Sequence, residues 1–223
     1  MSDEPGGFQG FPEEALDFYE GLEADNSRTY WQQHKATYEA AVRGPMLALL
    51  AALEPEFGPG KVFRPNRDVR FSADKSPYKT HCGAVLSQQR GHAGGYVEIS
   101  AAGLMVAGGY YATESDQVER YRRAVAEDVT GARLARIVAD LAAAGYDLGG
   151  QLLKTAPRGY PKDHPRVDLL RHRSLYAHRS WKPEPRLHTA AALDLVRDAW
   201  RAFGPLNDWL ADQVGASDRG RDQ

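Results

Sequence analysis

The sequence holds a single cysteine, Cys82, among 223 residues. One thiol excludes an internal disulfide and any zinc site built from several thiolates, and it is typical of a reducing compartment. The sequence also has no apolar run near the roughly 20 residues that a membrane-spanning helix needs. Its acidic first residues lack the basic and apolar regions of a secretory signal. We therefore expect a cytoplasmic protein that does not span a membrane.

Nucleotide and metal motifs are missing as well. The sequence contains neither a P-loop pattern (GxxxxGKS or GxxxxGKT) nor GxGxxG, the glycine-rich stretches that cradle phosphates. Its seven histidines show no HxH or HxxxH spacing, so no metal site is predicted and no cofactor is expected. His81 precedes Cys82, but neighbouring strand residues point to opposite faces of a sheet, which argues against a cysteine–histidine dyad.

The formal net charge is only −2, which does not favour a generally basic nucleic-acid binder. This small value hides an uneven distribution along the chain. Residues 1–60 carry a net −8, residues 61–101 a net +4 and residues 152–188 a net +6. Two separate basic segments predict a local surface that attracts anions.

Hydrophobic periodicity divides the chain into helical, extended and again helical parts. Apolar residues recur at helical spacing up to about Phe57, and the spacing becomes helical again after residue 115. Between and beyond these parts, extended chain is expected over residues 62–64 and 67–71, and strands over residues 82–87, 96–101, 104–111 and 174–181. The pattern predicts a single compact α+β domain, with helices packed on an antiparallel sheet of about four or five strands. The expected boundaries are a mobile arm (1–10), the domain (11–214) and a disordered tail (215–223).

Four stretches carry a family resemblance: FPEEALDFYEGLEADNSRTYW, FRPNRDVRFSADKSPYK, GGYY and KTAPRGY. In this order they resemble the uncharacterised family catalogued as domain of unknown function 2461. The resemblance runs from about Phe11 to about Trp181, and RDVRFSADKSPYK is its most specific part. It implies one α+β domain, and it implies no activity and no catalytic residues.

The central block, Phe63 to Lys79, places five basic residues against two acidic ones. Arginine is costly to bury and donates paired N–H groups to phosphate or carboxylate. We predict that the block lines a site for an anionic small molecule. The residues that contact the anion would be Arg64, Arg67, Arg70, Lys75 and Tyr78. The alternative is a structural ion-pair lattice, in which Asp68 pairs with an arginine and Asp74 caps its own turn.

A second basic segment, residues 154–164, has the sequence KTAPRGYPKDH. Gly159 allows close approach of the backbone to a ligand or a positive φ. We predict that Lys154 and Arg158 complete the anion site of the central block. The alternative is a rigid surface loop whose basic side chains are only solvated.

Acid–base groups are few, and the sequence names no reaction. Asp74 and Glu98 are the candidate catalytic residues; Glu98 stands alone in an expected strand and would need a basic partner if it pointed inward. Nucleic-acid binding is an alternative function, because Phe71, Tyr78 and Tyr160 would stack on bases beside the basic residues. A structural or interaction protein is the third possibility. The oligomeric state is not predicted.

Overall fold

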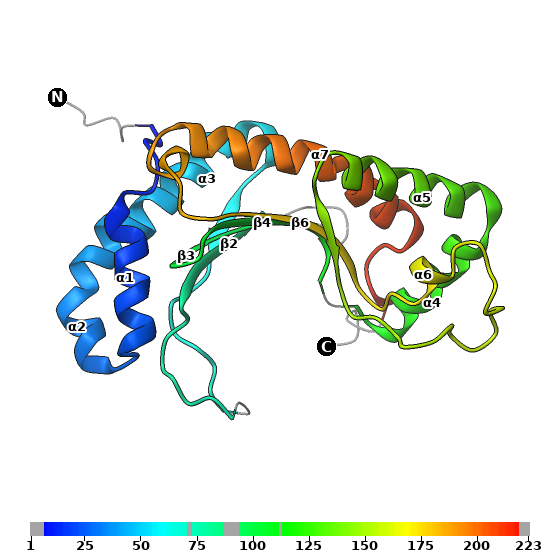
Figure 1. Ribbon diagram of the computed structural model, residues 1–223, viewed down its shortest axis with the longest axis horizontal. Coiled ribbons are helices and arrows are strands. Elements are labelled where there is room, and N and C mark those ends of the chain that lie inside the picture. The colour runs from blue at the N-terminus through cyan, green and yellow to red at the C-terminus, as the bar shows by residue number, and fades with distance from the viewer. Residues whose placement is uncertain (1–6, 71–72, 87–93, 112, 219–223) are drawn as a thin grey trace. The chain divides into compact units, whose positions relative to one another are not determined.

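The computed structural model describes residues 7–70, 73–86, 94–111 and 113–218. Helices and an antiparallel sheet form an α+β fold, which confirms the predicted class. The strands lie in the order β1-β2-β3-β4-β6-β5 (Figure 1). The sheet has six strands, so the prediction of four or five was wrong. Two strands, β1 (Gly60–Val62) and β5 (Asp147–Gly149), have only three residues each, which is too few to show a hydrophobic period. Of β1 only Val62 lies in the stretch expected to be extended, and β5 was not expected.

The four longer strands were all expected to within two residues: β2 (His81–Leu86), β3 (Gly94–Ser100), β4 (Gly103–Tyr110) and β6 (Leu175–Trp181). Strands β2 and β3 pair so that Cys82 lies opposite Ile99 and Ala84 opposite Val97. These four side chains are buried, whereas the alternate residues of β3 are half-exposed. Here the sheet therefore has one covered and one open face.

The chain folds into two compact units, and the first comprises residues 1–87, 96–106 and 180–198. Its helices are α1 (Glu13–Ala24), α2 (Arg28–Thr37) and α3 (Gly44–Phe57). Ser27 caps α2, because its side chain accepts a hydrogen bond from the Tyr30 backbone N–H at 3.1 Å. A π-helical turn, η1 (Tyr38–Arg43), leads directly into α3. Pro45 lies in the first turn of α3, where its nitrogen needs no hydrogen bond.

The second unit comprises residues 88–95, 107–179 and 199–223. It contains α4 (Ser115–Ala126), α5 (Asp128–Ala143) and the short α6 (Val167–Leu170). Residues 191–198 of helix α7 (Ala191–Gln213) belong to the first unit and residues 199–213, which include Pro205, to the second. Within the second unit the buried Trp209 fastens α7 to α5, because its indole N–H donates to the Thr130 carbonyl oxygen at 3.0 Å.

Both ends of the described chain are attached to these units. Phe8 is buried and meets Phe11 edge-on, with ring centroids 5.4 Å apart. The Ser217 hydroxyl donates to Asp116 at 2.9 Å. The outer parts of the expected arm and tail, residues 1–6 and 219–223, lie outside the described residues. Within the described ranges, no helix combines the length and the apolar character needed to cross a membrane.

Candidate anion-binding site

The central block belongs to the first unit and forms a narrow loop whose two sides run antiparallel (Figure 1). The Arg67 backbone N–H donates to the Pro77 carbonyl oxygen at 2.9 Å, and that of Lys79 to the Pro65 carbonyl oxygen at 2.8 Å. Residues 71–72, which include the expected stacking residue Phe71, lie outside the described residues. The block is thus a ribbon whose two sides hold each other.

Two arginines of this ribbon are paired within it. Arg70 makes a two-pronged contact with Asp68, with N···O distances of 3.0 and 2.7 Å. These hydrogen bonds lower the pKa of the Asp68 carboxyl. Arg67 forms an ion pair with Asp74. The Asp68–Arg70 pair is one that the structural alternative named, and the Arg67–Asp74 pair is an additional one. The positive charge of Arg67 and Arg70 is therefore locally balanced.

The turn of the block uses its remaining polar groups in the same way. Asp74 also accepts hydrogen bonds from the backbone N–H and the hydroxyl of Ser76, at 2.9 and 2.6 Å. The Lys75 ammonium donates to the Val69 carbonyl oxygen at 2.9 Å. Arg64 is exposed, and among the described residues it makes no side-chain hydrogen bond or ion pair. Asp74, a candidate acid–base group, is therefore occupied with organising its own turn.

Tyr78 is anchored from outside the block. The Asn26 side chain accepts from the Tyr78 backbone N–H at 3.1 Å and donates to the Tyr78 carbonyl oxygen at 3.0 Å. The Tyr78 ring is only 8% exposed and stacks on Trp31, with centroids 4.3 Å apart and planes 12° apart. These contacts fix the base of the ribbon on α2. Packing alone therefore accounts for the position of the Tyr78 side chain, and no ligand is needed to explain it.

Glu98, the other candidate acid–base residue, lies on the open face of the sheet. It accepts a hydrogen bond from the Tyr96 hydroxyl, and its nearest carboxylate oxygen lies 3.8 Å from the His81 Nε2. Its side chain is 21% exposed. Its nearest polar neighbours are therefore the Tyr96 phenol and the His81 imidazole, neither of which belongs to the central block.

Cys82 lies on the covered face and has a different environment. It is buried against Tyr38, and burial raises the pKa of its thiol to about 11. The thiol is therefore protonated at neutral pH and is a poor nucleophile. His81 precedes it on β2 and lies on the open face. Among the described residues, no three His, Cys, Asp or Glu side chains group closely enough to hold a metal ion.

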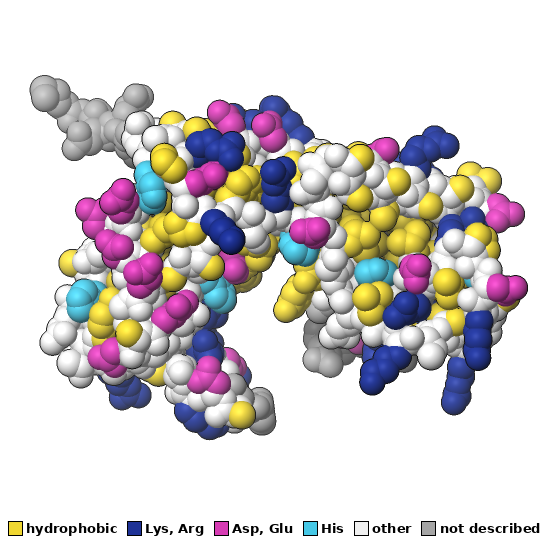
Figure 2. Space-filling model, viewed as in Figure 1, with side chains coloured by type: hydrophobic (Ala, Val, Ile, Leu, Met, Phe, Trp, Pro, Cys, Tyr) yellow, Lys and Arg dark blue, Asp and Glu magenta, His cyan; other side chains and the backbone are white. Residues whose placement is uncertain are grey.

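The second basic segment belongs to the second unit and precedes α6. Lys154 and Arg158 are both exposed, and neither pairs with a carboxylate among the described residues. Arg158 lies in a turn closed from the Tyr160 backbone N–H to the Pro157 carbonyl oxygen at 3.3 Å. Gly159 has φ of +85°, and a Cβ atom there would have nothing within 4 Å, so this turn is open to solvent. Lys and Arg side chains gather on this part of the surface (Figure 2).

Two arginines that follow the segment in the chain, Arg166 and Arg171, have structural roles. The Arg166 guanidinium donates to the Val125 and Ala126 carbonyl oxygens at 2.7 and 3.0 Å, and so caps the end of α4. The Arg171 Nε donates to the Leu153 carbonyl oxygen at 2.8 Å. The Arg166 bonds join residues 151–173 to the end of α4, and the Arg171 bond joins two parts of this stretch to each other.

The same fold brings together two arginines that were not predicted as site residues, Arg122 of α4 and Arg173. Arg122 is half-buried, and its Nε donates to the Leu170 carbonyl oxygen at 3.3 Å. Partial burial lowers the pKa of Arg122; nearby Tyr160 opposes this shift, and the positive charge of Arg173 adds to it. Among the described residues neither arginine has a carboxylate partner. The pair is an electropositive spot without internal compensation.

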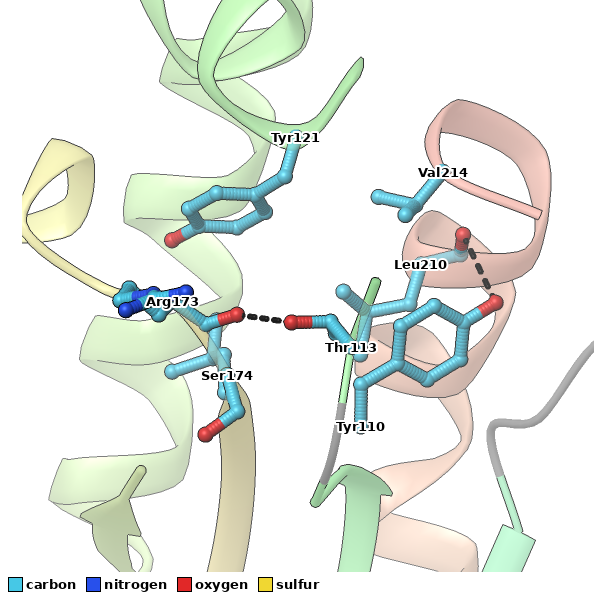
Figure 3. A pocket seen from close by; sticks show the side chains of 8 residues that line it. Tyr110, Thr113, Tyr121, Arg173, Ser174, Leu210 and Val214 are labelled. Carbon is cyan, nitrogen blue, oxygen red and sulfur yellow. Dashed lines mark hydrogen bonds between the residues drawn. The ribbon is translucent and has the colours of Figure 1, made fainter. Parts of the chain in front are cut away.

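A small cavity borders this spot on the inner side of Arg173 (Figure 3). Its volume is about 10 Å³, enough for about one water molecule. Thr113 donates to the Arg173 carbonyl oxygen across it, and the Tyr110 hydroxyl donates to that of Leu210 at 3.4 Å. The cavity is too small for a metabolite, so an anion would approach the guanidinium groups from the surface.

Comparison with known proteins gives a family and no relative of known activity. A model of a family described as conserved hypothetical protein (DUF2461) matches residues 14–209. No curated protein matches. No solved structure matches either.

Proposed function

Since the chain belongs to the conserved hypothetical family DUF2461, whose description states no activity, we propose from the geometry alone that it binds an anionic small molecule. The ligand carries a phosphate or carboxylate group. Arg122 and Arg173 hold that group, with the Tyr160 hydroxyl as a further donor. Lys154 and Arg158 form the basic rim of the site.

The observation that carries the proposal is the half-buried guanidinium of Arg122, which lacks a carboxylate partner among the described residues. A charge partly removed from water is costly unless an opposite charge compensates it. An anion held by Arg122 and Arg173 would supply that charge and would accept paired N–H groups from each side chain. Binding would also relieve the repulsion between the two arginines.

Charge supports placing the site in the second unit. Its residues include 16 basic and 13 acidic side chains, a net +3, whereas the first unit has 12 basic and 17 acidic ones, a net −5. In the central block, Asp68 and Asp74 already balance Arg70 and Arg67. These charges favour a site centred on the second segment over the joint site of both basic segments that the sequence predicted.

Thermal unfolding of the full chain with added inorganic phosphate or citrate tests the proposal. A ligand at five times its Kd stabilises the folded state by about 1 kcal/mol, which for a chain of this size raises Tm by about 2–4 °C. Arg122→Gln should abolish this rise. Sodium chloride at equal ionic strength serves as the reference for screening.

Arg133→Gln is the matched control, because Arg133 is exposed on α5, outside the site. It should retain the full response to phosphate. An equal response in wild type and Arg122→Gln would overturn the proposal. Tight, steeply salt-dependent binding of a single-stranded oligonucleotide, with no response to phosphate or citrate, would favour the nucleic-acid alternative instead.

A further inference from the structure

The open face of the sheet in the first unit carries a second group of polar and aromatic side chains, which the anion site does not use. Tyr96 and Glu98 of β3 and His81 of β2 lie on this face. Phe63 joins it from the base of the central block, with its ring centroid 6.4 Å from that of Tyr96. The Lys79 ammonium lies 5.1 Å from the Phe63 ring centroid. All five residues lie close together and remain partly accessible to solvent.

Gly83 makes this arrangement possible. It pairs with Glu98 across the two strands, and the Tyr96 side chain lies over it. A Cβ atom at position 83 would come within 2.6 Å of the Tyr96 hydroxyl oxygen. The missing side chain therefore lets the phenol reach Glu98 along the strand. Tyr96 and Glu98 are positioned before any ligand arrives.

The carboxylate of Glu98 keeps capacity for further hydrogen bonds. Two carboxylate oxygens offer about four acceptor positions. Among the described residues, only the Tyr96 hydroxyl donates to them, while His81 at 3.8 Å lies beyond hydrogen-bond distance. His81 and Lys79 add donors on the same face. Phe63, whose surface is 37% exposed, adds an apolar ring face beside that of Tyr96.

We propose that this face binds a neutral, hydroxyl-rich ring such as a saccharide. Hydroxyl groups both donate and accept, so they satisfy Glu98 and the donors His81 and Lys79 together. The C–H face of such a ring packs on Phe63 and Tyr96, as amphipathic ligands do on aromatic side chains. Glu98 would repel an anion, and Lys79 would repel a simple cation. A neutral polar ring avoids both repulsions.

Saturation-transfer NMR of the full chain tests this binding directly, with methyl glucoside, myo-inositol and adenosine as probes. We expect transfer to the ring protons of methyl glucoside. It should fall severalfold in Glu98→Gln and in Phe63→Ala, and stay unchanged in Ser100→Ala, a control on the same face of β3. Transfer to adenosine with none to methyl glucoside would overturn the assignment to a saccharide.

A fourth variant separates positioning from chemistry. Gly83→Ala keeps every donor and acceptor but displaces the Tyr96 hydroxyl, so it should weaken binding while the Arg122-dependent response to phosphate persists. That response also reports that the variant is folded. Absence of transfer to every probe, or equal transfer in wild type, Glu98→Gln and Phe63→Ala, would refute the proposal.

Discussion

The Arg166 guanidinium lies against the last turn of α4, with its Nε 2.7 Å from the Val125 carbonyl oxygen. The final carbonyl groups of a helix have no partner within the helix, and Arg166 supplies one. Only 13% of its side chain is exposed, although its ion-pair partner Asp128 is almost fully exposed. This single side chain fastens the second basic segment to α4 and so helps to place Arg122 beside Tyr160.

Arg166→Ala should therefore destabilise the fold. Part-buried hydrogen bonds from a charged donor contribute about 1.5–3 kcal/mol each, and for the two bonds to Val125 and Ala126 we expect a loss of about 3–6 kcal/mol in total. The ion pair with exposed Asp128 adds little. Urea denaturation measures the loss, and Arg136→Ala, an exposed arginine of α5, is the control. Equal stability of the two variants would show that the cap contributes nothing.

Asn26→Ala should destabilise the first unit. The Asn26 side chain bonds to both the backbone N–H and the carbonyl oxygen of Tyr78, and its removal leaves two part-buried backbone groups unpaired. Such groups cost about 1–3 kcal/mol when they lose their partners. Urea denaturation measures this as well, with Gln33→Ala at an exposed position of α2 as the reference. A loss no larger than that of Gln33→Ala would contradict the anchoring role.

The sequence was sufficient to predict the fold class and the longer helices and strands, because each of these elements spans at least one full period of its hydrophobic pattern. It placed only the end of β1, at Val62, in an extended stretch and did not predict β5; each of these strands has three residues and pairs at an edge of the sheet. The π-helical turn was also missed. Its apolar face continues the helical pattern on both sides, so no local signal distinguishes it.

The site that we propose shares only Lys154 and Arg158 with the site predicted from the sequence, because its other residues are brought together by the tertiary structure. Lys154 and Arg158 stand out in the sequence, whereas Arg122 looks like one charge among many in a polar helix. One signal was available: Arg122 shares its helix face with Val118 and Val125, both buried. An arginine on an apolar face needs a partner or a ligand. The hydrogen bond to Leu170 and the electrostatic influence of Arg173 come from residues distant in the sequence, which no local pattern encodes.

Arg70→Ala distinguishes the two basic segments as sites. Arg70 and Asp68 form an exposed pair, so we expect no measurable change in Tm. We also expect the stabilisation by phosphate to persist, because the second segment carries the anion. The joint site predicted from the sequence would instead require that Arg70→Ala abolish the stabilisation by phosphate. Loss of the phosphate response in this variant, with Tm in the absence of phosphate unchanged, would return the site to the central block.

The stability of the fold should fall as the pH drops through the range in which His172 takes up a proton. Burial lowers the pKa of His172 below its ordinary value of 6.5, although a hydrogen bond to the Ser174 carbonyl oxygen at 3.1 Å opposes the shift. The unfolded chain therefore takes up this proton at a higher pH than the folded one, and stability rises with pH between the two pKa values.

Urea denaturation above and below about pH 6.5 measures this dependence. His172→Gln should flatten the difference, and the half-exposed His178→Gln should leave it in place. An unchanged pH dependence in His172→Gln would show that other groups cause it.

The most direct test of the anion site is a phosphate titration followed by the Nε–H NMR signals of the arginines in the wild-type chain. We expect the signals of Arg122 and Arg173 to shift and to saturate together. Those of Arg70, bound to Asp68, and Arg166, bound to Val125, should stay in place and act as internal controls. A shift of Arg70 with none of Arg122 would contradict the proposal that the second basic segment binds the anion.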